Sequence, residues 1–265
     1  PGIFLCLLIA YVSIFLSEFI GIHILNLIKN PISPIMISII IGILIGNFFS
    51  IPMLFDDGIN FSLKIILRIG IICLGIRLGL LDILKIGLVG IPLIFICILF
   101  SILIVNYLSK KLNISYKMGS LIAVGTSICG ATAIVATSPV INADKEEVTY
   151  AIANITIFGI VVMFAYPFLA HYIFNGNELS VGLFLGTSIH ETAQVAGAGL
   201  IYSEQFDSTK TMDIATITKL VRNISMIIVI PTIGYLYLIK NTKQKTNQLS
   251  SIISMFPMFI IGFIL

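Results

Sequence analysis

Two basic residues lie deep inside an apolar stretch in the last third of the chain. Lys219 and Arg222 are three positions apart, so on a helix they share one face. Counted from Asp213 at 1.5 Å per residue, they lie about 9 and about 14 Å into the expected membrane span. Cations at that depth need counter-charges, and the planar guanidinium of arginine can donate two parallel hydrogen bonds to an oxyanion. We therefore expect both residues to bind a small anion. The alternative for Arg222 is a structural salt bridge with Glu191.

A second polar segment, Gly186 to Gln194, interrupts another apolar run. It places His190 and Glu191 near mid-depth, with Gln194 one helical turn away, and charged groups at that depth are usually functional. Glu191 is suited to take up a proton, and His190 to relay one. We expect these three residues to couple ion movement. The alternative is a buried polar knot that fixes helix register. No metal site is expected, because the second histidine of the zinc-protease helix is missing.

A third segment, Gly125 to Ala133, is rich in glycine and hydroxyl residues near the middle of its span. Such a composition weakens a continuous helix, and an interrupted backbone is tolerated in a membrane only where it faces protein or a wet cavity. A helix that restarts after Gly130 would direct free N–H groups and a positive dipole end at an anion. The alternative is tight packing of small residues, with hydroxyls bonded back to carbonyls. The expected substrate-binding residues here are Gly125, Thr126, Ser127, Cys129, Gly130 and Thr132.

The composition shows what kind of fold must position these segments. Of 265 residues, 58% are hydrophobic and 10% are charged, and the mean hydropathy is +1.12. A soluble domain is about 45–50% apolar and about 25% charged, and a disordered chain has few apolar residues. The net charge of +3 is too weak for a nucleic-acid binder. The long apolar runs favour helices over a membrane barrel, so we predict an all-α, polytopic membrane protein.

The apolar runs predict about eight full spans and a truncated one, each full span needing about 20 residues. Connections are short, so residues 1–265 form a single transmembrane domain, and the last run suggests a fragment of a longer chain. Arg68 and Arg77 are expected to snorkel from the ends of the third span. Lysines at 110–117 and 240–245 fall on one side, which the positive-inside rule assigns to the cytoplasm. The predicted spans are 3–20, 32–49, 61–80, 86–108, 118–141, 148–174, 180–201, 212–239 and 251–265.

A short repeat links two of the polar segments. The string Gly-Thr-Ser-Ile occurs at 125–128 and again at 186–189. If every predicted span crosses once, the two copies run parallel. They would then differ from the inverted pair expected of a transporter repeat.

The polar segments also carry a resemblance to a known family. The strings GTSICGATAIVATSPVINADKEE (125–147), GTSIHETAQVAGAG (186–199) and ATITKLVRN (215–223) resemble the signature blocks of the YeiH-like sulfate exporter family, and the block at 74–78 also fits. That family resembles transporters built from two inverted five-helix repeats, such as sodium/proton antiporters and bile-acid symporters. The resemblance implies an extra helix at 3–20, a first repeat at 32–174 with a discontinuous crossing helix near 118–141, and an incomplete second repeat at 180–265. The second crossing helix would follow residue 265.

These observations predict a secondary transporter, an exporter of a small anion such as sulfate or a related oxyanion or sulfonate, coupled to protons. The resemblance implies a bacterial inner or plasma membrane. The expected partners are the lipid bilayer and the anion, with no nucleic acid and no cofactor, and the sequence is compatible with a homo-oligomer. The alternatives are an anion channel, a receptor without transport, and a membrane enzyme that uses His190 and Glu191 as acid and base.

Overall fold

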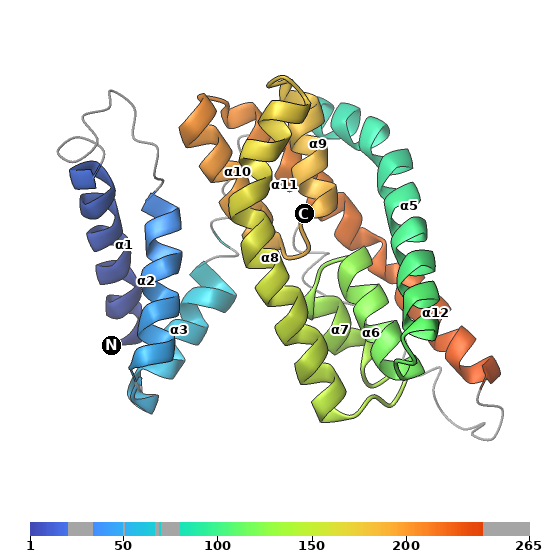
Figure 1. Ribbon diagram of the computed structural model, residues 1–265. Coiled ribbons are helices and arrows are strands. Elements are labelled where there is room, and N and C mark those ends of the chain that lie inside the picture. Colours follow the sequence, from blue (N-terminus) through green and yellow to red (C-terminus); the bar gives the residue numbers. More distant parts are fainter. Residues whose placement is uncertain (21–33, 50, 67–68, 70–79, 241–265) are drawn as a thin grey trace.

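The computed structural model describes residues 1–20, 34–49, 51–66, 69 and 80–240 (Figure 1). Every regular element in these ranges is helical, which confirms the predicted all-α class. Arg68, Arg77, the block at 74–78, the lysine cluster after Lys240 and the predicted span 251–265 lie outside the described residues. The predicted span 61–80 lies partly outside them.

Four helical stretches of the described chain are long and apolar enough to cross a membrane. On all of them except Thr209–Gly234, large apolar side chains face outward: on α5 (Leu80–Lys111), Phe95 and Phe100 are 66% and 63% exposed. Buried polar and charged side chains gather in the interior instead. This reversal of the soluble pattern is expected where lipid is the solvent. The four stretches are Gly2–Phe19, Ile86–Lys111, Lys145–Ile173 and Thr209–Gly234.

The amino-terminal helices form a group of their own in the structure. The first two predicted spans are found as α1 and α2, and α1 packs against both α2 and α3. Gly2 and Gly58 allow α1 and α3 to touch, because a Cβ at Gly58 would lie 2.7 Å from Cα of Gly2. The elements are α1 (Gly2–Phe19), α2 (Pro34–Phe48), the 3-10 helix η2 (Met53–Phe55), α3 (Asp56–Phe61) and the π-helix η3 (Ser62–Ile66).

The two helices between α5 and the next long helix are each too short to cross a membrane. Helix α6 has 12 residues, about 18 Å, and α7 has only seven. Ser115, just before α6, donates a hydrogen bond to Oε1 of Glu147 at 2.6 Å, and Lys117 Nζ lies 3.6 Å from Asp144 Oδ2. The segment therefore returns to the place where it started. The elements are α6 (Tyr116–Ser127), α7 (Ala131–Thr137) and the long α8 (Lys145–Ile173); we call α6 and α7 the first hairpin.

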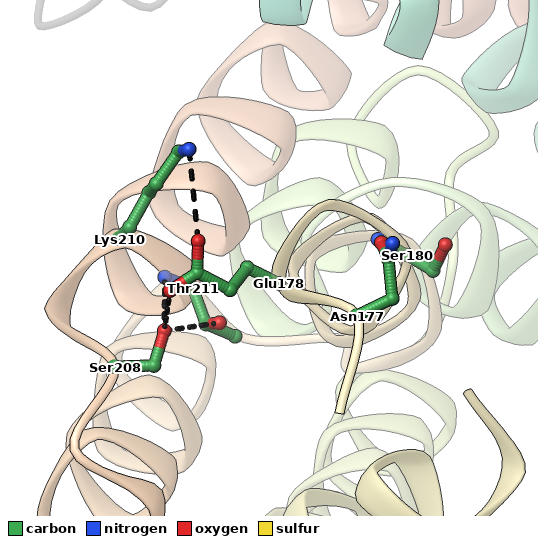
Figure 2. Close-up of polar contacts among 6 residues, drawn as sticks. All are labelled: Asn177, Glu178, Ser180, Ser208, Lys210 and Thr211. Atoms are coloured by element: carbon green, nitrogen blue, oxygen red, sulfur yellow. Dashed lines mark hydrogen bonds and ion pairs between the residues drawn. The ribbon is translucent and has the colours of Figure 1, made fainter. Parts of the chain in front are cut away.

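The segment after α8 repeats this arrangement at the other end of α8. Helix α9 has 11 residues, about 16 Å, which is again too short to cross. Ser208, just before α11, donates to Oε1 of Glu178 at 2.7 Å, and Lys210 Nζ lies 3.6 Å from Oε2 of Glu178 (Figure 2). The starts of α9 and α11 are thus tied together. The elements are α9 (Glu178–Ser188), α10 (Thr192–Phe206), α11 (Thr209–Ile224) and α12 (Met226–Lys240); we call α9 and α10 the second hairpin.

The two hairpins enter from opposite ends of α8. Figure 1 shows α6 and α7 near one end of this helix and α9 and α10 near the other. Helix α8 has 29 residues, about 43 Å, which is enough to cross once. One crossing, and not two, therefore separates the copies of Gly-Thr-Ser-Ile, so they run in opposite directions. The parallel orientation expected from the sequence is wrong, because each hairpin turns back to its own side.

Candidate functional site

The tips of the two hairpins are in contact. The first tip breaks at residues 128–130, where Gly130 has φ +67° and ψ −126°, a backbone that requires glycine. The second tip breaks at residues 189–191. A Cβ at Gly130 would lie 2.8 Å from Cγ of Glu191, so the glycine also permits the close approach. The interruption predicted in the 118–141 run is found, and a second one lies beside it.

Lys219 extends from α11 to both tips. Its side chain is fully buried, with no exposed surface. Nζ donates to three backbone carbonyl oxygens, those of Ile128 at 2.7 Å, Ile189 at 3.1 Å and His190. An ammonium has three donors. All three are therefore engaged by backbone.

Arg222 lies one turn further along the same face of α11 and also bridges the tips. Nε donates to the carbonyl of Ser127 at 2.8 Å. Nη1 donates to the carbonyls of Thr187 at 2.6 Å and Ile189 at 3.4 Å, and Nη2 donates to that of Thr126. Arg222 is 3% exposed, and its planar guanidinium makes all four bonds.

These bonds satisfy the carbonyl ends of α6 and α9. The last carbonyls of a helix have no partner within it, and they carry a partial negative charge. The arginine takes the threonine carbonyl of each repeat copy, Thr126 and Thr187, and the lysine takes the isoleucine carbonyl of each, Ile128 and Ile189. The repeat in the sequence is therefore matched by equivalent contacts on two oppositely directed hairpins.

Lys219 and Arg222 share a buried face, as expected, but their hydrogen bonds go to backbone carbonyls. Within the described part of the chain, Arg222 makes no ion pair with Glu191; Oε1 of Glu191 accepts from the Thr156 hydroxyl at 3.4 Å. Anion binding by the pair stays a prediction.

Further polar groups surround the tips. Gln194, 5% exposed, donates to the Thr156 carbonyl at 3.4 Å, and Asn223 donates to the Thr192 hydroxyl at 3.2 Å. Among the described residues, three buried polar atoms here have no hydrogen-bond partner: Nδ1 of His190, Oε1 of Gln194 and Oδ1 of Asn223. Sequence reasoning missed Asn223 as a site residue, although it directly follows Arg222.

The side chains predicted in the first hairpin mostly pack. The hydroxyls of Thr126 and Ser127 bond to carbonyls of their own helix, at 2.8 and 3.2 Å. A Cβ at Gly125 would lie 2.9 Å from a neighbouring isoleucine, and Cys129 is 4% exposed. These four residues therefore agree with the alternative interpretation, tight packing of small residues. Thr132 is exposed.

Known proteins resemble this chain over its whole length. Residues 1–265 match a family described as conserved hypothetical protein 698. A UPF0324 membrane protein of Streptococcus agalactiae is 35% identical over 265 residues, 100% of this chain and 75% of the relative. One of Fusobacterium nucleatum is 36% identical over 266 residues, 100% and 73%, and one of Streptococcus pneumoniae is 32% identical over 264 residues, 100% and 74%. No solved structure matches significantly. With its long apolar helices, the chain is a multi-pass protein of the cell membrane.

Proposed function

This chain belongs to the conserved hypothetical protein 698 family, the YeiH-like UPF0324 membrane proteins, and we propose that it is a secondary transporter of a small anion. One observation carries the proposal: two re-entrant hairpins enter from opposite sides and meet tip to tip around buried charge. Interrupted backbone at membrane depth is tolerated only against protein or a water-filled cavity. In secondary transporters, interrupted helices of inverted repeats form the substrate site near the midplane.

The charge at the tips favours an anion as the substrate. Lys219 and Arg222 carry two positive charges, and Glu191, when ionised, balances one of them. Coulomb attraction extends well beyond hydrogen-bond distance in a low dielectric, so the basic pair attracts an anion even though its donors face carbonyls. No side chain caps the start of α10 at Glu191, so the partly positive first turn of that helix also faces the tips. Sulfate, a related oxyanion or a sulfonate has the required charged oxygens.

The polar atoms without partners define where water and the anion contact protein. His190, Gln194 and Asn223 gather beside the tips, and each carries a buried atom without a partner among the residues that the structure describes. Nδ1 of His190 donates to the anion when it carries a hydrogen, whereas the amide oxygens of Gln194 and Asn223 accept from water molecules that bridge them to the anion. Glu191, at the tip itself, is the group that would gain and lose a proton as the anion moves. The proposed substrate residues therefore come from the second hairpin and α11 more than from the first hairpin.

The test is counterflow of labelled sulfate in proteoliposomes that contain the purified protein. We expect saturable counterflow, which a carrier gives and a channel does not. Asn223→Ala removes the amide oxygen that holds a bridging water, so it should raise the half-saturating sulfate concentration about tenfold, the effect of losing one buried hydrogen bond. Asn142→Ala, an exposed asparagine outside the site, is the matched control.

Three outcomes would reject the proposal. Steady single-channel anion currents would indicate a channel, and chemical conversion of the anion would indicate an enzyme. A folded protein with no counterflow for sulfate, sulfite, sulfonates or carboxylates would remove small anions as the substrate class.

A further inference from the structure

The ammonium of Lys219 lies inside a cage of carbonyl oxygens. We propose that this ammonium is a tethered substitute for a free monovalent cation, so that the hairpin tips assemble without sodium or potassium. Removal of the side chain would then convert the cage into a site for such an ion. This role of Lys219 holds the two tips together whatever anion the protein transports.

The cage has the ligands of an alkali-cation site. Its oxygens come from Ile128 at the end of α6 and from Ile189 and His190 at the end of α9, so both helices direct their negative ends at one point. Carbonyls of unwound helices coordinate sodium in transporters, and carbonyl rings replace the hydration shell of potassium in channels. An ammonium group resembles potassium in charge and size. Lys219 therefore fulfils from within the chain the requirement that a free ion would otherwise meet.

The surroundings leave the cage dependent on this one charge. Arg222 shares the Ile189 carbonyl at 3.4 Å, but its shorter bonds go to other carbonyls of the same helix ends. The carboxylate of Glu191 accepts from Thr156 and forms no ion pair with Lys219 in the described part of the chain. Without Lys219, the carbonyls of Ile128 and His190 would lose the donor that the structure shows for them, and buried unpaired carbonyls are costly.

Thermal unfolding in detergent tests the inference without any transport assay. The proteins are the wild type, Lys219→Ala and Lys219→Met, with Lys210→Ala as the matched control. Lys210 lies on the same helix, but its side chain is 73% exposed at the start of α11 (Figure 2). Each protein is melted in choline chloride and then in sodium, potassium or methylammonium chloride at constant ionic strength.

We expect the wild type and the Lys210→Ala variant to melt at the same temperature in every salt. Lys219→Ala should melt at least about 4 °C lower in choline, the shift expected for the loss of a buried interaction. Its melting temperature should rise with the logarithm of the small-cation concentration, as for a ligand that binds only the folded state. Lys219→Met keeps most of the stem volume, so it separates lost charge from an enlarged cavity and should show the same dependence.

Two results would overturn the inference. One is a wild-type melting temperature that rises in sodium or potassium relative to choline, because the cage would then take a free ion already. The other is a pair of Lys219 variants whose response to these cations matches that of Lys210→Ala. If neither Lys219 variant can be purified, the wild-type comparison decides. Absent counterflow with intact cation rescue would reject the anion substrate and leave the role of Lys219 standing.

Discussion

Replacing Arg222 by alanine removes four donors from the tips at once. The lost bonds go to the carbonyls of Thr126, Ser127, Thr187 and Ile189. Hydrogen bonds between membrane helices average about 0.6 kcal/mol, so four of them give a lower bound of about 2 kcal/mol. Breaking a buried charge interaction by removing one partner costs about 3–5 kcal/mol in soluble proteins. We therefore expect Arg222→Ala to lower the free energy of unfolding by about 2–5 kcal/mol.

Two further variants test whether the planar set of hydrogen bonds from Arg222, and not its charge alone, stabilises the tips. Arg222→Lys keeps the charge but has three donors on one nitrogen, which cannot span four carbonyls in the same plane. It should lose roughly half as much stability as the alanine variant. Lys210→Ala removes an exposed ion-pair partner and should change stability by less than about 1 kcal/mol.

The assay is reversible unfolding by sodium dodecyl sulfate in mixed micelles, followed by circular dichroism. A free energy of unfolding for Arg222→Ala within about 0.5 kcal/mol of the wild type would refute the reasoning, because surface substitutions alone stay within that range. The carbonyl ends of α6 and α9 would then be satisfied by water, and the tips would be held by other contacts.

Three other predictions follow from the hairpins. Asn113→Cys and Asn142→Cys, placed in a protein without other reactive thiols, should both react with an impermeant maleimide from the same side of the membrane; labelling from opposite sides would mean that α6 and α7 cross. Gly130→Ala should lower the free energy of unfolding by about 1–3 kcal/mol, because the added Cβ would meet Glu191 and the positive φ is strained for alanine. Gly42→Ala is the control, since open space surrounds a Cβ there, and equal melting temperatures of the two variants would contradict a strained tip. Glu191→Gln should remove the pH dependence of counterflow, because it removes the carboxyl group proposed to carry the coupled proton; an unchanged profile would make Glu191 structural.

The interruption of the first polar segment could be predicted because its cause is local. Gly130 and its small neighbours weaken a helix whatever surrounds them, and the structure breaks there. The shared face of Lys219 and Arg222 could also be predicted, since helical spacing alone determines it. Both properties depend on residues that are close in the sequence.

The return of the hairpins could not be predicted from hydropathy. The 118–141 run is as long as a crossing span, and nothing in its composition separates one crossing helix from two short ones. The contacts that fix the return, such as Ser115 with Glu147 and Ser208 with Glu178, join loops about 30 residues apart. The partners of Arg222 could not be predicted either, because every residue has a carbonyl oxygen and the sequence does not show which of them face this side chain. The search for a counter-charge therefore led to Glu191.

The bonds from α11 to both tips also determine which parts of the protein can move. Lys219 and Arg222 make three hydrogen bonds to the first tip and four to the second, so parting the tips would break at least three of them. A movement that opens one tip while the other stays closed would have to break those hydrogen bonds in every transport cycle. Alternating access is therefore expected to displace both hairpins and α11 as one rigid block against the remaining helices, so that the anion travels together with its site.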